Sequence, residues 1–161
     1  MSNDDTVVRT SITVQAPVER AFHVFTEQLG AFKPREHNLL GVEIAETVLE
    51  PHVGGAVFDR GVDGTTCRWA RVLAFEPPER LVLSWDISPR WQIESDPAKS
   101  SEVEIRFLAQ TGGSTRVELE HRHLDRHDEG WQSVRDAVAG EQGWPLYLER
   151  YAELFSRQPA R

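Results

Sequence analysis

The sequence has little cysteine and no long hydrophobic run, and both absences exclude classes of protein. Cys67 is the only cysteine among 161 residues, so no disulfide can form within the chain. A lone thiol is typical of a reducing compartment. No apolar stretch approaches the ~20 residues that a membrane span needs, and the acidic N-terminus lacks the basic and apolar segments of a secretory signal. We therefore expect a cytoplasmic protein that makes no membrane contact.

Positive charge is also scarce. Lysine and arginine number 18 against 26 acidic residues, which gives a net charge of −8. Such a balance opposes binding to nucleic acid or to anionic lipid. The sequence contains no Gly-x-Ser-x-Gly elbow, no P-loop and no dinucleotide fingerprint. We expect no nucleic-acid partner and no cofactor.

The distribution of apolar residues predicts one α+β domain over residues 1–161, with a core at about 7–156 and short flexible termini. An amphipathic helix is expected at 17–29, with Gly30 as its terminator. Strands are expected at 7–14, 41–50, 55–61, 65–75, 80–87, 101–109 and 114–123. The last six follow one another without a helix between them, which predicts an antiparallel meander.

The C-terminal segment has a helical pattern with an interruption. Gly140 and Gly143 weaken a helix, and Pro145 cannot donate a hydrogen bond to the preceding turn. We expect a separate helix or turn at 131–139 and a long packed helix at 145–156. Trp144 precedes proline and is expected in a loop. Segment 124–143 would then form a gate, because locally weak elements open most easily.

Several short motifs occur in an order that resembles one known family. They are Leu29–Pro34 with His37, the pair Gly54–Gly55, the turn Glu76–Glu79 followed by Trp85, and the triplet Gly143–Pro145. The chain resembles the activator of Hsp90 ATPase homologue-like family, within the SRPBCC, START and Bet v 1-like superfamily. The resemblance implies a helix-grip fold, in which a curved seven-stranded antiparallel sheet wraps around a long C-terminal helix and encloses a cavity. It covers roughly residues 12–155.

The family resemblance implies two kinds of partner. Small single-domain members look like ligand-binding proteins, which implies a hydrophobic small molecule. The family name implies the chaperone Hsp90, but the eukaryotic activators resemble a two-domain architecture with a separate N-terminal domain. This sequence starts at the first strand of the helix-grip domain, which argues against Hsp90 contact.

Aromatic residues supply the candidate cavity wall. Five tryptophans occur in the chain, and indole rings often line small-molecule cavities. We predict ligand contacts from Trp69, Trp85 and Phe107, and we expect Trp144 to plug a cavity mouth or cover the sheet edge. The alternative interpretation for each ring is ordinary core packing.

Two histidines near the end of the last strand are the candidate polar groups. His121 and His123 share a strand face with Val117 and Leu119 by period-two alternation, so both are predicted to line the concave side. They could anchor a ligand or act as a general base, or they could be ordinary hydrogen-bonded histidines. With His127 they suggest a metal ion, but no fourth ligand at a recognised spacing is present, so we predict no metal site.

Charged residues within strands provide weaker candidates. Asp59, Arg60 and Asp86 could act as acids or bases, although charged strand residues more often form a solvated face, which is the interpretation adopted. The catalytic residues, if any exist, are therefore unknown from the sequence.

Three functions remain open at this point. The first is a binding protein that holds a hydrophobic, aromatic or polyketide-like molecule between the sheet and the last helix. The second is a cyclase or hydrolase that uses His121 or His123 as general acid or base. The third is a protein-interaction module, either a chaperone partner or a homodimer, for which Trp91 in a polar loop would be the exposed contact.

Overall fold

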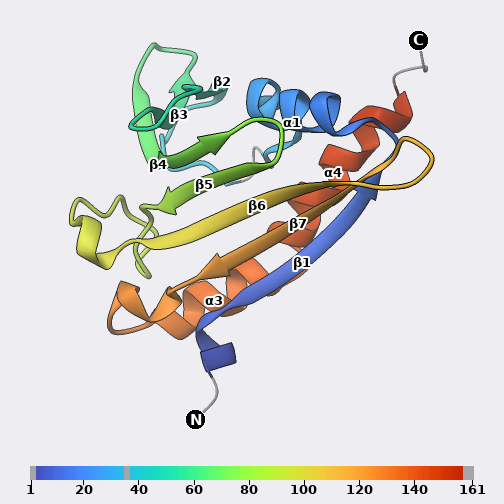
Figure 1. The fold of residues 1–161 in the computed structure, drawn as a ribbon. Coiled ribbons are helices and arrows are strands. Elements are labelled where there is room, and N and C mark those ends of the chain that lie inside the picture. The colour runs from blue at the N-terminus through green and yellow to red at the C-terminus, as the bar shows by residue number, and fades with distance from the viewer. Residues whose placement is uncertain (1–2, 35–36, 158–161) are drawn as a thin grey trace.

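Seven strands form one antiparallel sheet that curves around the C-terminal helices (Figure 1). The computed structural model describes residues 3–34 and 37–157. The outermost termini, expected to be flexible, lie outside the described residues. The strands are β1 (Val8–Val14), β2 (Ile44–Leu49), β3 (Ala56–Gly61), β4 (Thr66–Glu76), β5 (Arg80–Trp85), β6 (Ser101–Ala109) and β7 (Thr115–Arg122). The predicted α+β helix-grip architecture is confirmed.

Four α-helices and three short 3-10 helices complete the described chain. The α-helices are α1 (Val18–Glu27), α2 (Leu29–Phe32), α3 (Trp131–Ala139) and α4 (Trp144–Arg157), and the 3-10 helices are η1 (Asn3–Thr6), η2 (Pro97–Lys99) and η3 (Leu124–His127). Among the described residues, no helix combines the length and apolar character that crossing a bilayer would require.

The strand order in the sheet is β1-β7-β6-β5-β4-β3-β2. Strands β2 to β7 are each paired with their neighbour in sequence, as the expected meander requires. Strand β1 pairs with β7 in register from Val8 opposite His121 to Val14 opposite Thr115. The chain thus returns its first strand to the side of its last, and the α1–α2 segment connects that edge to the opposite edge at β2.

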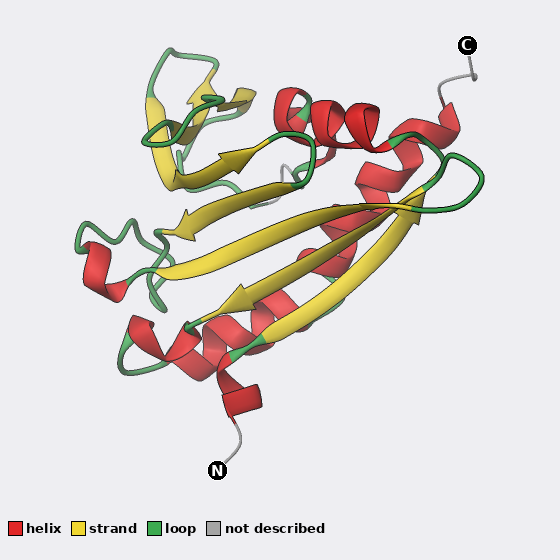
Figure 2. Ribbon diagram, in the orientation of Figure 1, coloured by secondary structure: helices red, strands yellow, loops and turns green. Residues whose placement is uncertain are grey.

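The helices cover the concave face of this sheet (Figure 2). Phe22 and Phe25 of α1 pack edge-on against Phe107 of β6, with ring centroids 5.1 and 5.7 Å apart. Tyr151 of α4 is fully buried and donates its hydroxyl to the Ala21 carbonyl at 2.6 Å. This aromatic cluster fills one end of the space between sheet and helices, so any cavity must lie toward the other end.

Two helix boundaries differ from the expectation. The predicted helix at 17–29 ends at Glu27, and a one-turn helix α2 follows that includes Gly30, the expected terminator. Trp144 opens α4 rather than lying in a loop. Pro145 therefore occupies the second helical position, where a missing N–H leaves no bond unmade.

The predicted interruption of the C-terminal helix is present. α3 ends at Ala139, and Gly140 adopts extended angles as its C-cap. A Cβ atom on Gly143 would collide with the Val138 carbonyl, so the chain turns between α3 and α4 only with glycine at this position. Whether segment 124–143 acts as a gate stays a prediction.

The convex face carries a ladder of paired charges. Glu104 of β6 accepts hydrogen bonds from Arg80 of β5 and Arg122 of β7, and Arg122 also bonds to Glu102. Burial opposes ionisation of Glu104, but these guanidinium groups prevail and lower its pKa to about 2. The convex face of β5, β6 and β7 therefore carries a cross-strand ion network.

Candidate functional site

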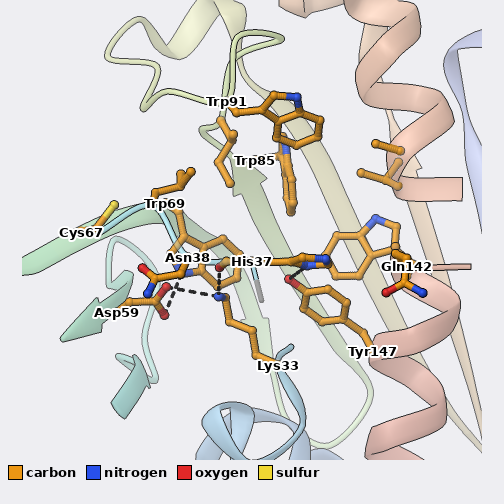
Figure 3. A pocket seen from close by; sticks show the side chains of 16 residues that line it. Lys33, His37, Asn38, Asp59, Cys67, Trp69, Trp85, Trp91, Gln142 and Tyr147 are labelled. Carbon is orange, nitrogen blue, oxygen red and sulfur yellow. Dashed lines mark hydrogen bonds and ion pairs between the residues drawn. The ribbon is translucent and has the colours of Figure 1, made fainter. Parts of the chain in front are cut away.

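A cavity of about 430 Å³ opens between the β3–β5 half of the sheet and the junction of α3 with α4 (Figure 3). This size lies within the range of small-molecule sites. Its wall is mostly apolar and aromatic, with a few polar groups gathered on one side. The lining residues are Lys33, His37, Asn38, Leu39, Asp59, Cys67, Trp69, Trp85, Ile87, Trp91, Ala137, Val138, Gln142, Gly143, Trp144 and Tyr147.

The aromatic wall is a continuous chain of rings in contact. Trp85 lies between Trp69 and Trp144, with ring centroids 6.0 and 5.4 Å away and edge-to-face geometry on both sides. Trp144 in turn contacts Tyr147 at 4.7 Å. Trp69 and Trp85 extend from adjacent strands, whereas Trp144 and Tyr147 come from the first turn of α4. The wall therefore exists only where the sheet faces this helix.

A buried ion pair forms the polar side of the cavity. Lys33 Nζ lies 3.2 Å from Asp59 Oδ2, with side chains 5% and 3% exposed. Asp59 also accepts hydrogen bonds from Thr47 at 2.6 Å and from Trp69 Nε1 at 3.4 Å, while Lys33 donates to the His37 carbonyl at 2.8 Å. Each charge thus has a partner, as burial demands.

Two further ionisable groups face the same space. The Tyr147 hydroxyl lies 3.5 Å from His37 Nδ1, and burial, reinforced by Asp59, raises the pKa of Tyr147. Burial followed by the charge of Asp59 raises the pKa of Cys67, which Lys33 partly offsets. Tyr147 and Cys67 are therefore both protonated near neutral pH.

A second polar chain lies behind the aromatic wall. Trp144 Nε1 donates to His121 Nδ1 at 3.0 Å. Ser101 Oγ lies 2.7 Å from His121 Nε2 and 2.7 Å from His127 Nε2. All four side chains are buried.

The direction of these hydrogen bonds follows from the Trp144 indole, whose N–H can only donate. His121 Nδ1 must then be the acceptor, so its proton is on Nε2 and is donated to Ser101. The Ser101 hydroxyl is free to donate to His127. Burial, and then His127, lowers the pKa of His121 to about 3, so His121 is neutral and holds Trp144 in place.

Of the six residues predicted to bind a ligand, three line the cavity in the structure, namely Trp69, Trp85 and Trp144. Phe107 packs in the aromatic cluster with α1 instead. His121 shares the inner face but lies behind the wall. Their roles toward a ligand stay predictions.

His123 does not share the concave face, so that expectation was wrong. β7 ends at Arg122, and His123 has a left-handed backbone with φ of 59° and an exposed side chain. The period-two alternation stops there because the chain leaves the extended conformation. No group of three or more His, Cys, Asp or Glu side chains in the described part of the chain is arranged to hold a metal ion.

The solvated-face interpretation was wrong for Asp59 and Asp86, both of which are buried. Asp86 accepts two bonds from Arg71, at 3.1 and 3.2 Å, and one from Ser100 at 2.6 Å. These bonds tie both ends of the loop 86–100 to the sheet. That loop presents Trp91 at the cavity, 45% exposed and with a φ of 60°.

Several lining residues escaped the sequence reasoning. Lys33 belongs to the motif Leu29–Pro34, in which it directly follows the apolar pair Ala31 and Phe32. A lysine beside apolar residues within that motif was the available signal. Tyr147 sits one turn before Tyr151 on the packed stripe of α4, which marks it as inward-facing. Asp59 lies two residues after the buried Val57 on β3 and therefore shares its face. The period-two pattern of a strand could have predicted this.

Both the sequence and the fold of the chain resemble those of known proteins. The sequence model of the family described as "Activator of Hsp90 ATPase homolog 1-like protein" matches residues 15–156. No curated protein matches the chain significantly. Among solved structures, the anthrahydroquino-gamma-pyrone synthase Txn09 shares 37% identity over 96% of this chain and 99% of its own, with a TM-score of 0.66.

Two other structures resemble the chain at lower identity. CalC from Micromonospora echinospora, a self-sacrificing resistance protein, is 27% identical over 99% of both chains, with a TM-score of 0.67. A protein from Nitrosomonas europaea is 14% identical, covers 99% of both chains with a TM-score of 0.67, and shows the shared fold alone.

Proposed function

Because the chain belongs to the family of activator of Hsp90 ATPase homolog 1-like proteins, we propose that it binds a planar aromatic small molecule in the cavity between the sheet and the α3–α4 junction. One observation supports this most directly. About 430 Å³ of space is walled by Trp69, Trp85 and Trp144 and has its polar groups on one side. Aromatic walls with a few placed polar groups are typical of ligand sites.

The polar side favours a ligand without net charge. Lys33 and Asp59 neutralise one another at 3.2 Å, and Tyr147 keeps its proton because burial raises its pKa. A charged ligand would need an opposite charge to offset its desolvation. A neutral aromatic with oxygen substituents needs none.

The test fills the cavity with a larger side chain and compares it with the same substitution outside the cavity. Ala137 lines the cavity from α3, while Ala139 on the same helix is exposed and lies outside the lining. Ala137→Trp should weaken binding of a planar tricyclic probe such as 9-fluorenone by roughly tenfold or more, a loss of about 1.4 kcal/mol. Ala139→Trp should leave it unchanged. Equal binding by both variants, measured by titration calorimetry, would contradict the proposal.

The 37% identity to Txn09 favours a second function, ring closure on an oxygenated aromatic substrate. The groups available to such a reaction are Tyr147, His37 and the Lys33–Asp59 pair, not the histidines named from the sequence. Tyr147→Phe should then abolish turnover of a pyrone precursor while binding persists. Full turnover by that variant would remove Tyr147 from the chemistry.

A further inference from the structure

Four tryptophans line the cavity, and the N–H groups of the three buried ones differ in what they meet. Trp144 Nε1 donates to His121 and Trp69 Nε1 to Asp59. Trp85 Nε1 is buried and has no hydrogen-bond partner among the described residues. Two donors are thus turned back into the protein, and the third is left without a protein acceptor.

An unmade hydrogen bond of this kind is costly. A buried donor without a partner has lost the hydrogen bond to water that it makes in the unfolded chain, so such donors are rare and each calls for an explanation. The packing around Trp85 explains why no protein group satisfies it. The ring is 6% exposed and contacts the rings of Trp69, His121 and Trp144 at 5.4 to 6.0 Å. These rings fix the direction of the N–H, and both His121 nitrogens are already engaged.

We propose that the Trp85 indole N–H is the hydrogen-bond donor for a bound ligand, and that the ligand is a planar aromatic molecule with a carbonyl or phenolic oxygen at the Trp85 end. This inference rests on the proposed function and deepens it by naming the chemical class. The oxygen accepts from Trp85 Nε1 while its ring system lies along the aromatic wall. The donor selects oxygenated aromatics over plain hydrocarbons.

Trp91 gives access to this donor. Figure 3 shows the nitrogen-bearing edge of Trp85 turned toward Trp91, and both residues line the cavity. Trp91 is the most exposed of the four cavity tryptophans and has a left-handed backbone that is unusual for a bulky residue. Because Trp85 Nε1 is itself covered, the proposed bond requires the side chain that covers it to shift, and Trp91 is the exposed neighbour on that side.

A matched pair of probes isolates the hydrogen bond. 9-Fluorenone and fluorene share one planar three-ring skeleton and differ by a single carbonyl. Their affinity ratio for the wild-type protein should favour fluorenone, and Trp85→Phe should reduce that ratio by about 3- to 10-fold, the worth of one neutral hydrogen bond. Trp69→Phe is the control, because its N–H already bonds to Asp59, and should preserve the ratio.

The possible outcomes separate the two proposals. If both probes bind and Trp85→Phe leaves the ratio unchanged, the donor serves a standing water only and the inference is overturned. If neither probe binds the wild-type protein, both the proposed function and the inference that rests on it are wrong. Loss of the ratio in both Phe variants would also overturn the inference, since it would show a general effect of wall packing.

A second measurement needs no variant. In protein labelled with ¹⁵N at tryptophan, the indole proton of Trp85 should move downfield on addition of fluorenone and much less with fluorene. The Trp69 and Trp144 indole protons should move little with either probe, because their acceptors are in the protein. A shift confined to those two signals would assign the carbonyl to another donor and overturn the proposal.

Discussion

The cavity wall is supported by two buried polar clusters that use opposite chemistry. The Lys33–Asp59 cluster is ionic, belongs to the α2 corner and β3, and reaches the cavity. The cluster of His121, Ser101 and His127 is neutral, joins β6 and β7 to Trp144 at the start of α4, and lies behind the wall. Each fixes one cavity indole by accepting its N–H.

The difference shows how position within the fold selects the chemistry. An ion pair survives burial only when both charges are matched, and here the pair sits where a ligand can also contact it. The cluster behind the wall does not line the cavity and holds no ion pair, and a chain of neutral donors and acceptors satisfies its buried polar groups. The first cluster lies in the cavity lining, whereas the second is in contact with the cavity through Trp144, which it positions.

Breaking the ion pair should have the largest effect. Asp59→Leu leaves Lys33 buried without its counter-charge, which should lower the free energy of unfolding by about 3–5 kcal/mol. The double variant Lys33→Met with Asp59→Leu should recover much of that loss, because it buries no charge. Urea denaturation of the three proteins gives the comparison. A double variant as unstable as the single one would show that the pair stabilises through packing alone.

The neutral cluster should instead respond to pH. His121 has a folded pKa of about 3 against an ordinary 6.5, so between these values the unfolded chain binds more protons. The contribution of His121 to the free energy of unfolding is fully present above pH 6.5 and is lost as pH falls toward 3. The free energy of unfolding changes there by up to about 1.4 kcal/mol per pH unit. Burial also lowers the pKa of His127, which adds to the same trend.

His121→Asn should make that slope shallower by up to one proton, because the asparagine does not titrate. The check is the free energy of unfolding from urea titrations at pH 7, 6, 5 and 4. Parallel curves for wild type and variant would mean that His121 is not the titrating group.

Removing the acceptor of Trp144 should have a smaller effect at neutral pH. His121→Phe leaves the Trp144 N–H and the Ser101 hydroxyl without their partner, at a cost of about 1–3 kcal/mol. His121→Asn keeps an oxygen near the Nδ1 position and should cost less. Thermal unfolding ranks the variants, and the Trp144 indole proton signal reports the bond itself. An unmoved signal in His121→Phe would refute the positioning role.

The smallest expected effect concerns Cys67, which lies beside the ionic cluster. After burial, the charge of Asp59 is the main cause of its raised pKa. Asp59→Asn should therefore increase the thiolate fraction and speed its reaction with a disulfide reagent by about two- to threefold at pH 8. Asp63→Asn, at an exposed turn, is the control and should not change the rate. A slower reaction in Asp59→Asn would reverse the assigned electrostatics.

Local sequence patterns predicted several residues of the site and the elements that carry them. Trp69 and Trp85 lie on strands whose ends and alternation were clear, and Gly140, Gly143 and Pro145 marked the turn between α3 and α4. The face of His121 followed from its spacing with Val117 and Leu119. His123 failed because a single left-handed residue ends the alternation, and no pattern of side chains announces that change.

The sequence by itself determined the α+β class, the strand order along the chain and the family, because these depend on apolar periodicity, on turn residues and on short motifs. Tertiary structure alone decided which polar groups meet. Lys33 and Asp59 are 26 positions apart and Trp144 and His121 are 23 apart, and their partnership depends on how the sheet curves against the helices. Burial then determines which of these groups are charged, since the free energy of a charge depends on its surroundings in space and not on its neighbours in the sequence.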